Sequence, residues 1–141
     1  MTDKQKFSLI HPLRVRWAEC DAQGIVFNVN YFLYFDVAMT EWLRAVGFAG
    51  EKTLEFFTVH AEADYKGSAR FDEMIDVCVR CVQFGRSSMT LEANIFRGEE
   101  LLTIGKLIYV HAEPKTQETA PLPSDFVARV LAFEKTAPEQ R

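Results

Sequence analysis

Residues 16–36 read RWAECDAQGIVFNVNYFLYFD, and the second half of this stretch decides the fold. Residues 30–46 predict a helix that is capped by Asn28 or Asn30 and that ends at Gly47. Apolar side chains cover almost its whole circumference, because only a narrow strip is polar: Asp36, Thr40, Glu41 and Arg44. A helix that is apolar on nearly all sides must be covered by other structure, so we expect it to lie at the centre of the fold.

Segments in which apolar and polar residues alternate lie on both sides of this helix in the sequence. One, residues 13–17, precedes the helix, and four follow it: 57–65, 75–81, 89–95 and 102–110. Short connections at 85–87 and 98–100 predict that the last three of these strands form an antiparallel meander. Residues 121–135, PLPSDFVARVLAFEK, predict a short amphipathic helix with Ser124 as its cap.

The expected fold class is therefore α+β, with a five-stranded antiparallel sheet wrapped around one apolar helix and a short helix near the C-terminus. The 141 residues suit a single domain over residues 1–141, because the chain contains no repeat, low-complexity tract or linker. The outer face of the expected sheet is mixed rather than fully polar, which suggests pairing with another subunit.

Composition narrows the function classes. The net charge of -4 argues against a protein that coats nucleic acid, because such proteins usually carry a basic face. The N-terminal sequence MTDKQKF lacks the apolar segment of a signal peptide, and no later run approaches membrane-spanning length. Three cysteines form no disulfide framework. We therefore expect a cytoplasmic protein without membrane insertion.

The cysteines and histidines are interpreted as structural residues rather than as metal ligands or catalysts. Cys78 and Cys81 are spaced like a metal or redox pair, but on a strand their side chains would point to opposite faces of the sheet. Cys20 has no neighbouring base and is interpreted as a small, half-buried residue. The histidines lie far apart, without metal-ligand spacing: His11, His60 and His111. We therefore expect neither a metal nor an organic cofactor.

Asp21 stands where the loop DAQGIVFN runs into the amino end of the predicted helix. Free N–H groups and the helix dipole favour an anion there, and the same N–H groups can accept the charge that grows on a carbonyl oxygen during acyl transfer. Gly24 would let the substrate approach the backbone closely. The residues alone leave two alternatives, because Asp21 either organises the loop or catalyses hydrolysis of an activated acyl group.

The polar strip of the helix carries two more acids, Asp36 and Glu41. One of them could position a water molecule, but a structural salt bridge with Arg44 or another residue is the favoured interpretation.

Residues 15–43, VRWAECDAQGIVFNVNYFLYFDVAMTEWL, resemble a segment of the hot-dog-fold acyl-CoA thioesterases, both the 4-hydroxybenzoyl-CoA thioesterase type and the Tol-Pal-associated type. The shared pattern is an aspartate, a glycine three positions later, two aliphatic residues, an aromatic residue and an Asn-Tyr pair that opens the helix. In this chain the pattern falls on Asp21, Gly24, Ile25, Val26, Phe27, Asn30 and Tyr31. The order of elements matches from about residue 13 to residue 111, which implies the hot-dog fold.

The resemblance implies that Asp21 is the catalytic carboxylate, as nucleophile or as general base, and that backbone N–H groups around Asn28 polarise the thioester carbonyl. Asn28 departs from the family pattern, which has a histidine or an aromatic residue there. A second departure is Gly67-Ser68 in the segment DYKGSARFDE. The expected oxyanion and substrate-binding residues are Gly24, Val26, Phe27, Asn28, Tyr31 and Tyr65.

The family binds coenzyme A near subunit boundaries, so the implied partners are an acyl-CoA substrate and one or three further copies of the chain, in a homodimer or homotetramer. Candidates for contact with coenzyme A are basic and hydroxyl residues: Lys66, Ser68, Arg70, Arg86, Ser87 and Ser88. The serines after Gly85 are interpreted first as a turn.

The expected activity is hydrolysis of an aromatic or short-chain acyl-CoA to free acid and coenzyme A. Two alternatives remain. One is a module that binds acyl-CoA or a protein without catalysis. The other is an acyl-thioester hydratase or dehydratase, which usually pairs an acid with a histidine on the helix segment, where this chain has none.

Overall fold

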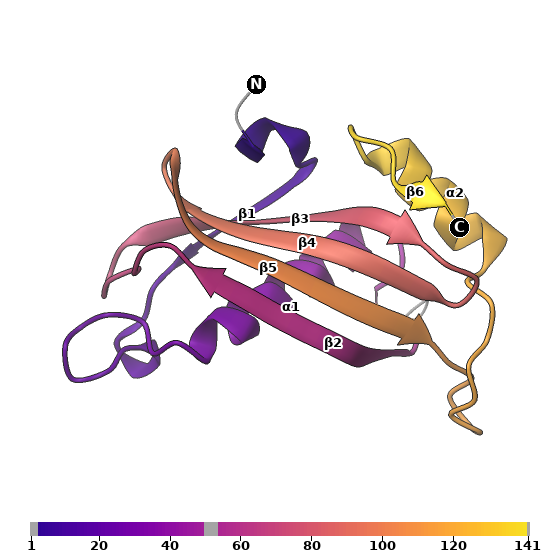
Figure 1. The fold of residues 1–141 in the computed structure, drawn as a ribbon, viewed down its shortest axis with the longest axis horizontal. Helices are drawn as coiled ribbons and strands as arrows, with labels where there is room; N and C mark the ends of the chain where they lie inside the picture. The colour runs from indigo at the N-terminus through magenta and orange to yellow at the C-terminus, as the bar shows by residue number, and fades with distance from the viewer. Residues whose placement is uncertain (1–2, 50–53, 141) are drawn as a thin grey trace.

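The computed structural model describes residues 3–49 and 54–140, and it contains a curved sheet with one helix along its inner face (Figure 1). The strands lie in the order β1-β3-β4-β5-β2, and all neighbours in this order are antiparallel. A short sixth strand, β6, pairs with β3 in parallel. The strands are β1 (Leu9–Arg14), β2 (Phe56–Tyr65), β3 (Met74–Phe84), β4 (Ser88–Arg97), β5 (Glu100–His111) and β6 (Glu139–Gln140). The helices are η1 (Asp3–Lys6), η2 (Trp17–Glu19), α1 (Asn30–Ala45) and α2 (Ser124–Phe133).

The predicted α+β hot-dog arrangement and the meander of β3, β4 and β5 are confirmed. The sixth strand was not predicted, because a two-residue strand has no period that a sequence could display.

The central position of α1 follows from its buried side. Tyr34, Phe35 and Trp42 are almost fully buried in the main core, where they pack with inward-facing residues of β3, β4 and β5. Burial of each such side chain contributes roughly 1.5–3 kcal/mol. Gly105 lets α1 approach β5, because a Cβ atom at this position would lie 2.6 Å from Cζ of Phe35. In the single chain Leu33 and Val37 remain exposed on one flank of α1, so the helix is not covered all round.

The first strand ends earlier than the alternation of residues 13–17 predicts. β1 ends at Arg14, and the chain then turns into the short helix η2, which leaves Trp17 62% exposed. The turn forms because the Glu19 carboxylate accepts a hydrogen bond from the backbone N–H of Arg16, at 2.9 Å. A side chain that bonds to nearby backbone competes with a strand ladder, and alternation alone does not reveal that competition.

Both predicted helix caps are wrong. Val29 is the N-cap residue of α1 and Pro123 that of α2, and neither makes a side-chain cap hydrogen bond. The first N–H groups of α1 instead bond to carbonyls one turn back, and the side chain of Asn30 donates to the carbonyl of Glu19 at 2.8 Å. The predicted stop at Gly47 is confirmed, since its φ of +88° favours a glycine.

The two strand cysteines lie on opposite faces of the sheet, as predicted. Cys78 packs with Phe7 and Phe96 in a small cluster, whereas Cys81 belongs to the main core under α1. Burial raises the pKa of both thiols to about 12. No helix within residues 3–49 and 54–140 has the length and apolar character that crossing a bilayer requires.

Candidate active site

Asp21 lies in a tight turn between η2 and α1. Its N–H donates to the carbonyl of Ile25 at 2.9 Å, and its carbonyl accepts from the N–H of Gly24 at 3.0 Å. Gly24 has a φ of +78°, which side-chain-bearing residues rarely adopt, and a Cβ atom there would meet nothing within 4 Å. The turn therefore needs a glycine at this position, and the second expected role of Gly24, clearance for a substrate, stays a prediction.

The carboxylate of Asp21 is held on one side only. Its Oδ1 accepts a hydrogen bond from the N–H of Gln23 at 2.8 Å, which fixes the rotamer as in an Asx turn. Its Oδ2 has no hydrogen-bond partner among the described residues. The side chain is half-buried and borders a cavity of about 300 Å³. One carboxylate oxygen is thus available to a ligand or a water molecule.

The same cavity reaches the start of α1. The N–H groups of Asn28 and Val29 have no acceptor in the described part of the chain, because the hydrogen bonds of the first helical turn begin at Asn30. Asn28 lines the cavity, and its carbonyl accepts a hydrogen bond from the hydroxyl of Tyr65 at 3.0 Å. The arrangement combines an unpaired carboxylate oxygen with an unpaired N–H donor at the positive end of a helix.

Tyr31 forms part of the buried wall of the cavity. It is 3% exposed, its oxygen accepts a hydrogen bond from the N–H of Ala69 at 3.0 Å, and its ring centre lies 5.4 Å from that of Tyr65. Burial raises the pKa of the Tyr31 phenol, so the hydroxyl keeps its proton at neutral pH. The wall is therefore aromatic, and the hydroxyls of Tyr31 and Tyr65 are each bonded to the backbone.

The structure brings together most of the residues that the sequence predicted for the substrate pocket. Besides Ile25 and Gly67, the cavity is lined by seven of the candidates: Asp21, Val26, Phe27, Asn28, Tyr31, Tyr65 and Ser68. Gly24 lies beside it, in the turn. Lys66 adjoins the lining residues in the chain, and Arg70 pairs with Ile25 across an isolated bridge. The side chains of Lys66 and Arg70 are exposed and have no partner among the described residues.

Three further candidates lie elsewhere in the chain. Arg86 and Ser87 belong to the connection between β3 and β4 and Ser88 begins β4, at the opposite end of the sheet from the Asp21 loop (Figure 1). The 11 residues of β3 separate the two places, a span of roughly 35 Å. Within a single chain the coenzyme A candidates therefore lie at two separate places, and their contact with coenzyme A stays a prediction.

Other reactive residues stay outside the cavity. Glu41 forms an ion pair with Arg44 at 3.3 Å, as favoured from the sequence. Cys20 is half-buried, its Sγ donates to the carbonyl of Arg16 at 3.6 Å, and burial raises its pKa. The thiol is therefore not activated as a nucleophile, in agreement with its structural interpretation.

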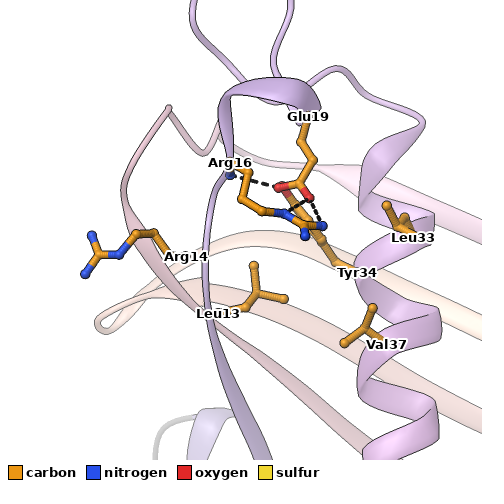
Figure 2. A pocket seen from close by; sticks show the side chains of 7 residues that line it. All are labelled: Leu13, Arg14, Arg16, Glu19, Leu33, Tyr34 and Val37. Carbon is orange, nitrogen blue, oxygen red and sulfur yellow. Dashed lines mark hydrogen bonds and ion pairs between the residues drawn. The ribbon is translucent and has the colours of Figure 1, made fainter.

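Glu19 is the residue that sequence reasoning missed. It is 5% exposed, and its carboxylate binds the side chain of Arg16 and the hydroxyl of Tyr34, the latter at 2.9 Å (Figure 2). The spacing of Arg16 and Glu19, three positions apart, would have indicated an ion pair only if a helical turn had been expected there. This network borders a second cavity of about 300 Å³, which does not include Asp21.

Comparisons with known proteins agree with this geometry. A family profile described as the thioesterase superfamily matches residues 23–104. A protein of Aquifex aeolicus (strain VF5) named "Putative esterase" is 31% identical over 120 residues, which cover 82% of this chain and 92% of that protein. The acyl-CoA thioester hydrolase YbgC of Escherichia coli O6:H1 is 25% identical over 122 residues, 83% of this chain and 91% of YbgC. A thioesterase of Thermus thermophilus, crystallised with coenzyme A and Zn, superposes with a TM-score of 0.84 at 25% identity, over 94% of this chain and 98% of that one.

Proposed function

The chain belongs to the thioesterase superfamily and is by homology an acyl-CoA thioester hydrolase, and on this premise we propose that Asp21 is the carboxylate that carries the reaction. One observation carries the proposal: Asp21 and Asn28 line a single cavity, and among the described residues neither Oδ2 of Asp21 nor the N–H of Asn28 has a partner. The carboxylate oxygen can attack the thioester carbon or activate a water molecule, and the N–H can hold the carbonyl oxygen.

Polarisation of the thioester is the role of the helix start. The carbonyl oxygen accepts a hydrogen bond from the N–H of Asn28, and its developing negative charge lies at the positive end of α1. A preorganised donor of this kind stabilises the transition state by about 3 kcal/mol. Because the donor is a backbone group, a residue other than the histidine or aromatic of related sequences can occupy position 28.

Asp21 then completes the reaction by one of two routes. As a nucleophile, Oδ2 attacks the carbonyl carbon, the C–S bond breaks, and coenzyme A leaves as a thiolate that takes a proton; water then hydrolyses the mixed anhydride to the free acid. As a general base, Oδ2 removes a proton from a water molecule that attacks the carbon directly. A thioester is already activated, so one carboxylate and one oxyanion donor are sufficient chemistry for either route.

The cavity walls favour an apolar acyl group. Its volume of about 300 Å³ is at the lower end for ligand pockets, and its walls include the side chains of Val26, Phe27, Tyr31 and Tyr65. Such walls suit a short-chain or aromatic acyl group better than a long chain.

The phosphates of coenzyme A would meet basic residues at two places. Lys66 and Arg70 flank the cavity within the same chain, and their side chains, which have no partner in the part of the chain that the structure describes, suit phosphate oxygens. Arg86, Ser87 and Ser88 can join this site only from a second copy of the chain. The proposal therefore includes a homodimer or homotetramer, and an active enzyme that is monomeric at micromolar concentration by light scattering would contradict this part.

A panel of acyl-CoA esters tests the activity. Release of free thiol from aromatic and short-chain esters is the expected result, and its absence from every ester would favour a module that only binds acyl-CoA. A hydratase is disfavoured because none of the three histidines lines the cavity. After a single turnover in water labelled with ¹⁸O, label in the Asp21 carboxylate would identify the nucleophilic route, because only an anhydride opened at the Asp21 carbon places a water oxygen there.

A further inference from the structure

Glu19 is a buried carboxylate with a full set of hydrogen bonds. Its Oε1 accepts from the backbone N–H of Arg16 at 2.9 Å and from the hydroxyl of Tyr34 at 2.9 Å, and its Oε2 accepts from Nε of Arg16 at 2.7 Å. The bonds therefore join the segment between β1 and η2 to the second turn of α1. Figure 2 shows Glu19 and Arg16 facing each other above the side chain of Tyr34, whereas Arg14 points away.

The backbone of Glu19 holds the other end of the loop. Its carbonyl accepts hydrogen bonds from the N–H of Phe27 at 2.9 Å and from the side chain of Asn30 at 2.8 Å. The segment between Phe27 and Asn30 carries the free N–H of Asn28, and Asp21 follows Glu19 by two positions. One residue thus joins both ends of the loop that carries the two proposed reacting groups.

From these contacts we infer that Glu19 is a positioning residue that fixes Asp21 and the N–H of Asn28 relative to each other. The inference rests on the proposed function for the meaning of these two groups. It extends that function by assigning part of the rate to a residue that touches neither substrate nor water at the reacting carbon.

The charge of Glu19 suits this role. Burial by itself would raise the pKa of its carboxyl, but hydrogen bonds from Arg16 and Tyr34 outweigh burial and lower the pKa below its usual value. Arg16 is also the nearest cation, while the exposed Arg14 is bonded to the carbonyl of Asp72 at 2.7 Å. Glu19 therefore stays ionised at neutral pH, and the charge-assisted bonds that hold the loop persist.

Glu19→Gln is the appropriate variant, because it keeps the length of the side chain. Its amide NH₂ would face the N–H donors of Arg16 or the hydroxyl of Tyr34, so at least one bond of the network is lost. Glu92→Gln is the matched control, because Glu92 also binds an arginine, Arg80 at 2.9 Å, and lies outside both the cavity and the loop. Tyr34→Phe removes one donor and leaves the carboxylate in place.

The first readout is amide hydrogen exchange, which needs no activity. In Glu19→Gln we expect exchange over residues 20–30 to accelerate about tenfold or more, while β3, β4 and β5 keep the exchange rates of the wild type. The second is kinetics, where kcat should fall about 10- to 100-fold with little change in KM, because the reacting groups are displaced rather than lost. Tyr34→Phe should shift both readouts in the same direction by less, and Glu92→Gln should shift neither.

Two results would overturn the inference. One is a Glu19→Gln protein with the loop exchange and kcat of the wild type. The other is faster exchange throughout the sheet, because Glu19 would then act on global stability alone. If the wild type releases no thiol from any ester, the proposed function fails, and the exchange readout still decides whether Glu19 holds the loop.

Discussion

At the scale of single residues, the site depends on which polar atoms remain unpaired. The first N–H groups of a helix have no partner within it, and those of Asn28 and Val29 are unpaired within the described part of the chain. They lie at the start of α1, beside a carboxylate whose Oδ2 is also free. The proposed donor of Asn28 is a backbone group, so the proposal does not require a particular side chain at position 28.

Gly24 allows a prediction at this scale, because two explanations of the glycine give different results. Its φ of +78° makes Gly24→Ala cost about 1 kcal/mol of stability, while the added methyl group meets no atom within 4 Å. We therefore expect a lower free energy of unfolding in urea and an unchanged KM. A KM raised about tenfold in a protein of wild-type stability would show instead that the glycine clears space for the substrate.

At the scale of elements, the contact between α1 and β5 depends on a missing side chain. A Cβ atom at Gly105 would lie 2.6 Å from Cζ of Phe35 and 2.8 Å from the carbonyl of Ala93. Gly105→Ala should therefore cost about 1–3 kcal/mol of unfolding free energy, since a well-packed core resists an added methyl group. Urea denaturation measures the loss.

The matched control for this prediction is a second substitution at the ring itself. In a Phe35→Leu background the terminal ring atoms are absent, so Gly105→Ala should cost clearly less than in the wild type. Equal costs in both backgrounds would mean that the helix does not approach β5 through this glycine.

A second contact between elements depends on pH. Glu134, which is 8% exposed, ties the end of α2 to β3 and α1, because its Oε2 accepts from the N–H of Cys81 at 2.5 Å and from Nε1 of Trp42 at 3.1 Å. Its Oε1 is buried without a partner among the described residues. Burial raises the pKa of Glu134 above its usual 4.5, despite the opposing effect of these bonds and of Arg80.

The sign of the pH effect follows from this shift. Between the ordinary pKa of 4.5 and the raised pKa of the folded state, the native protein binds more protons than the unfolded chain, so stability falls as pH rises. Glu134→Gln does not titrate, so the stability of the wild type should fall relative to this variant as the pH rises from the ordinary pKa of 4.5 to above the raised pKa. Denaturation curves at the two ends of this pH range measure the free energy of unfolding of both proteins. A difference in this free energy that stays constant with pH would contradict the raised pKa.

At the scale of the whole molecule, the sequence predicted more of the fold than of the site. The apolar helix and the alternating strands imposed one architecture, because each needs the other to bury its apolar side. The end of β1 and the start of α1 were missed, since they depend on the bond from the N–H of Arg16 to the Glu19 side chain and on the bond from the Asn30 side chain to the carbonyl of Glu19. Local patterns cannot display such bonds.

The site was predictable where it is local in sequence. A single loop contains Asp21, Phe27 and Asn28, and in the structure all three line one cavity. Arg86 could not be placed from its type alone, because its distance from the loop is set by the length and direction of β3. Glu19 escaped notice because its partners are spread along the chain, from Arg16 just before η2 to Asn30 and Tyr34 on α1.

The central claim is that the Asp21 carboxylate performs the hydrolysis. The most direct test is kcat/KM for thiol release by Asp21→Asn, compared with Asp125→Asn, which makes the same change on α2, away from the cavity. We predict that kcat/KM falls at least about 100-fold in Asp21→Asn, in a protein of wild-type stability, and that it is unchanged in Asp125→Asn. A folded Asp21→Asn protein that keeps the kcat/KM of the wild type would contradict it.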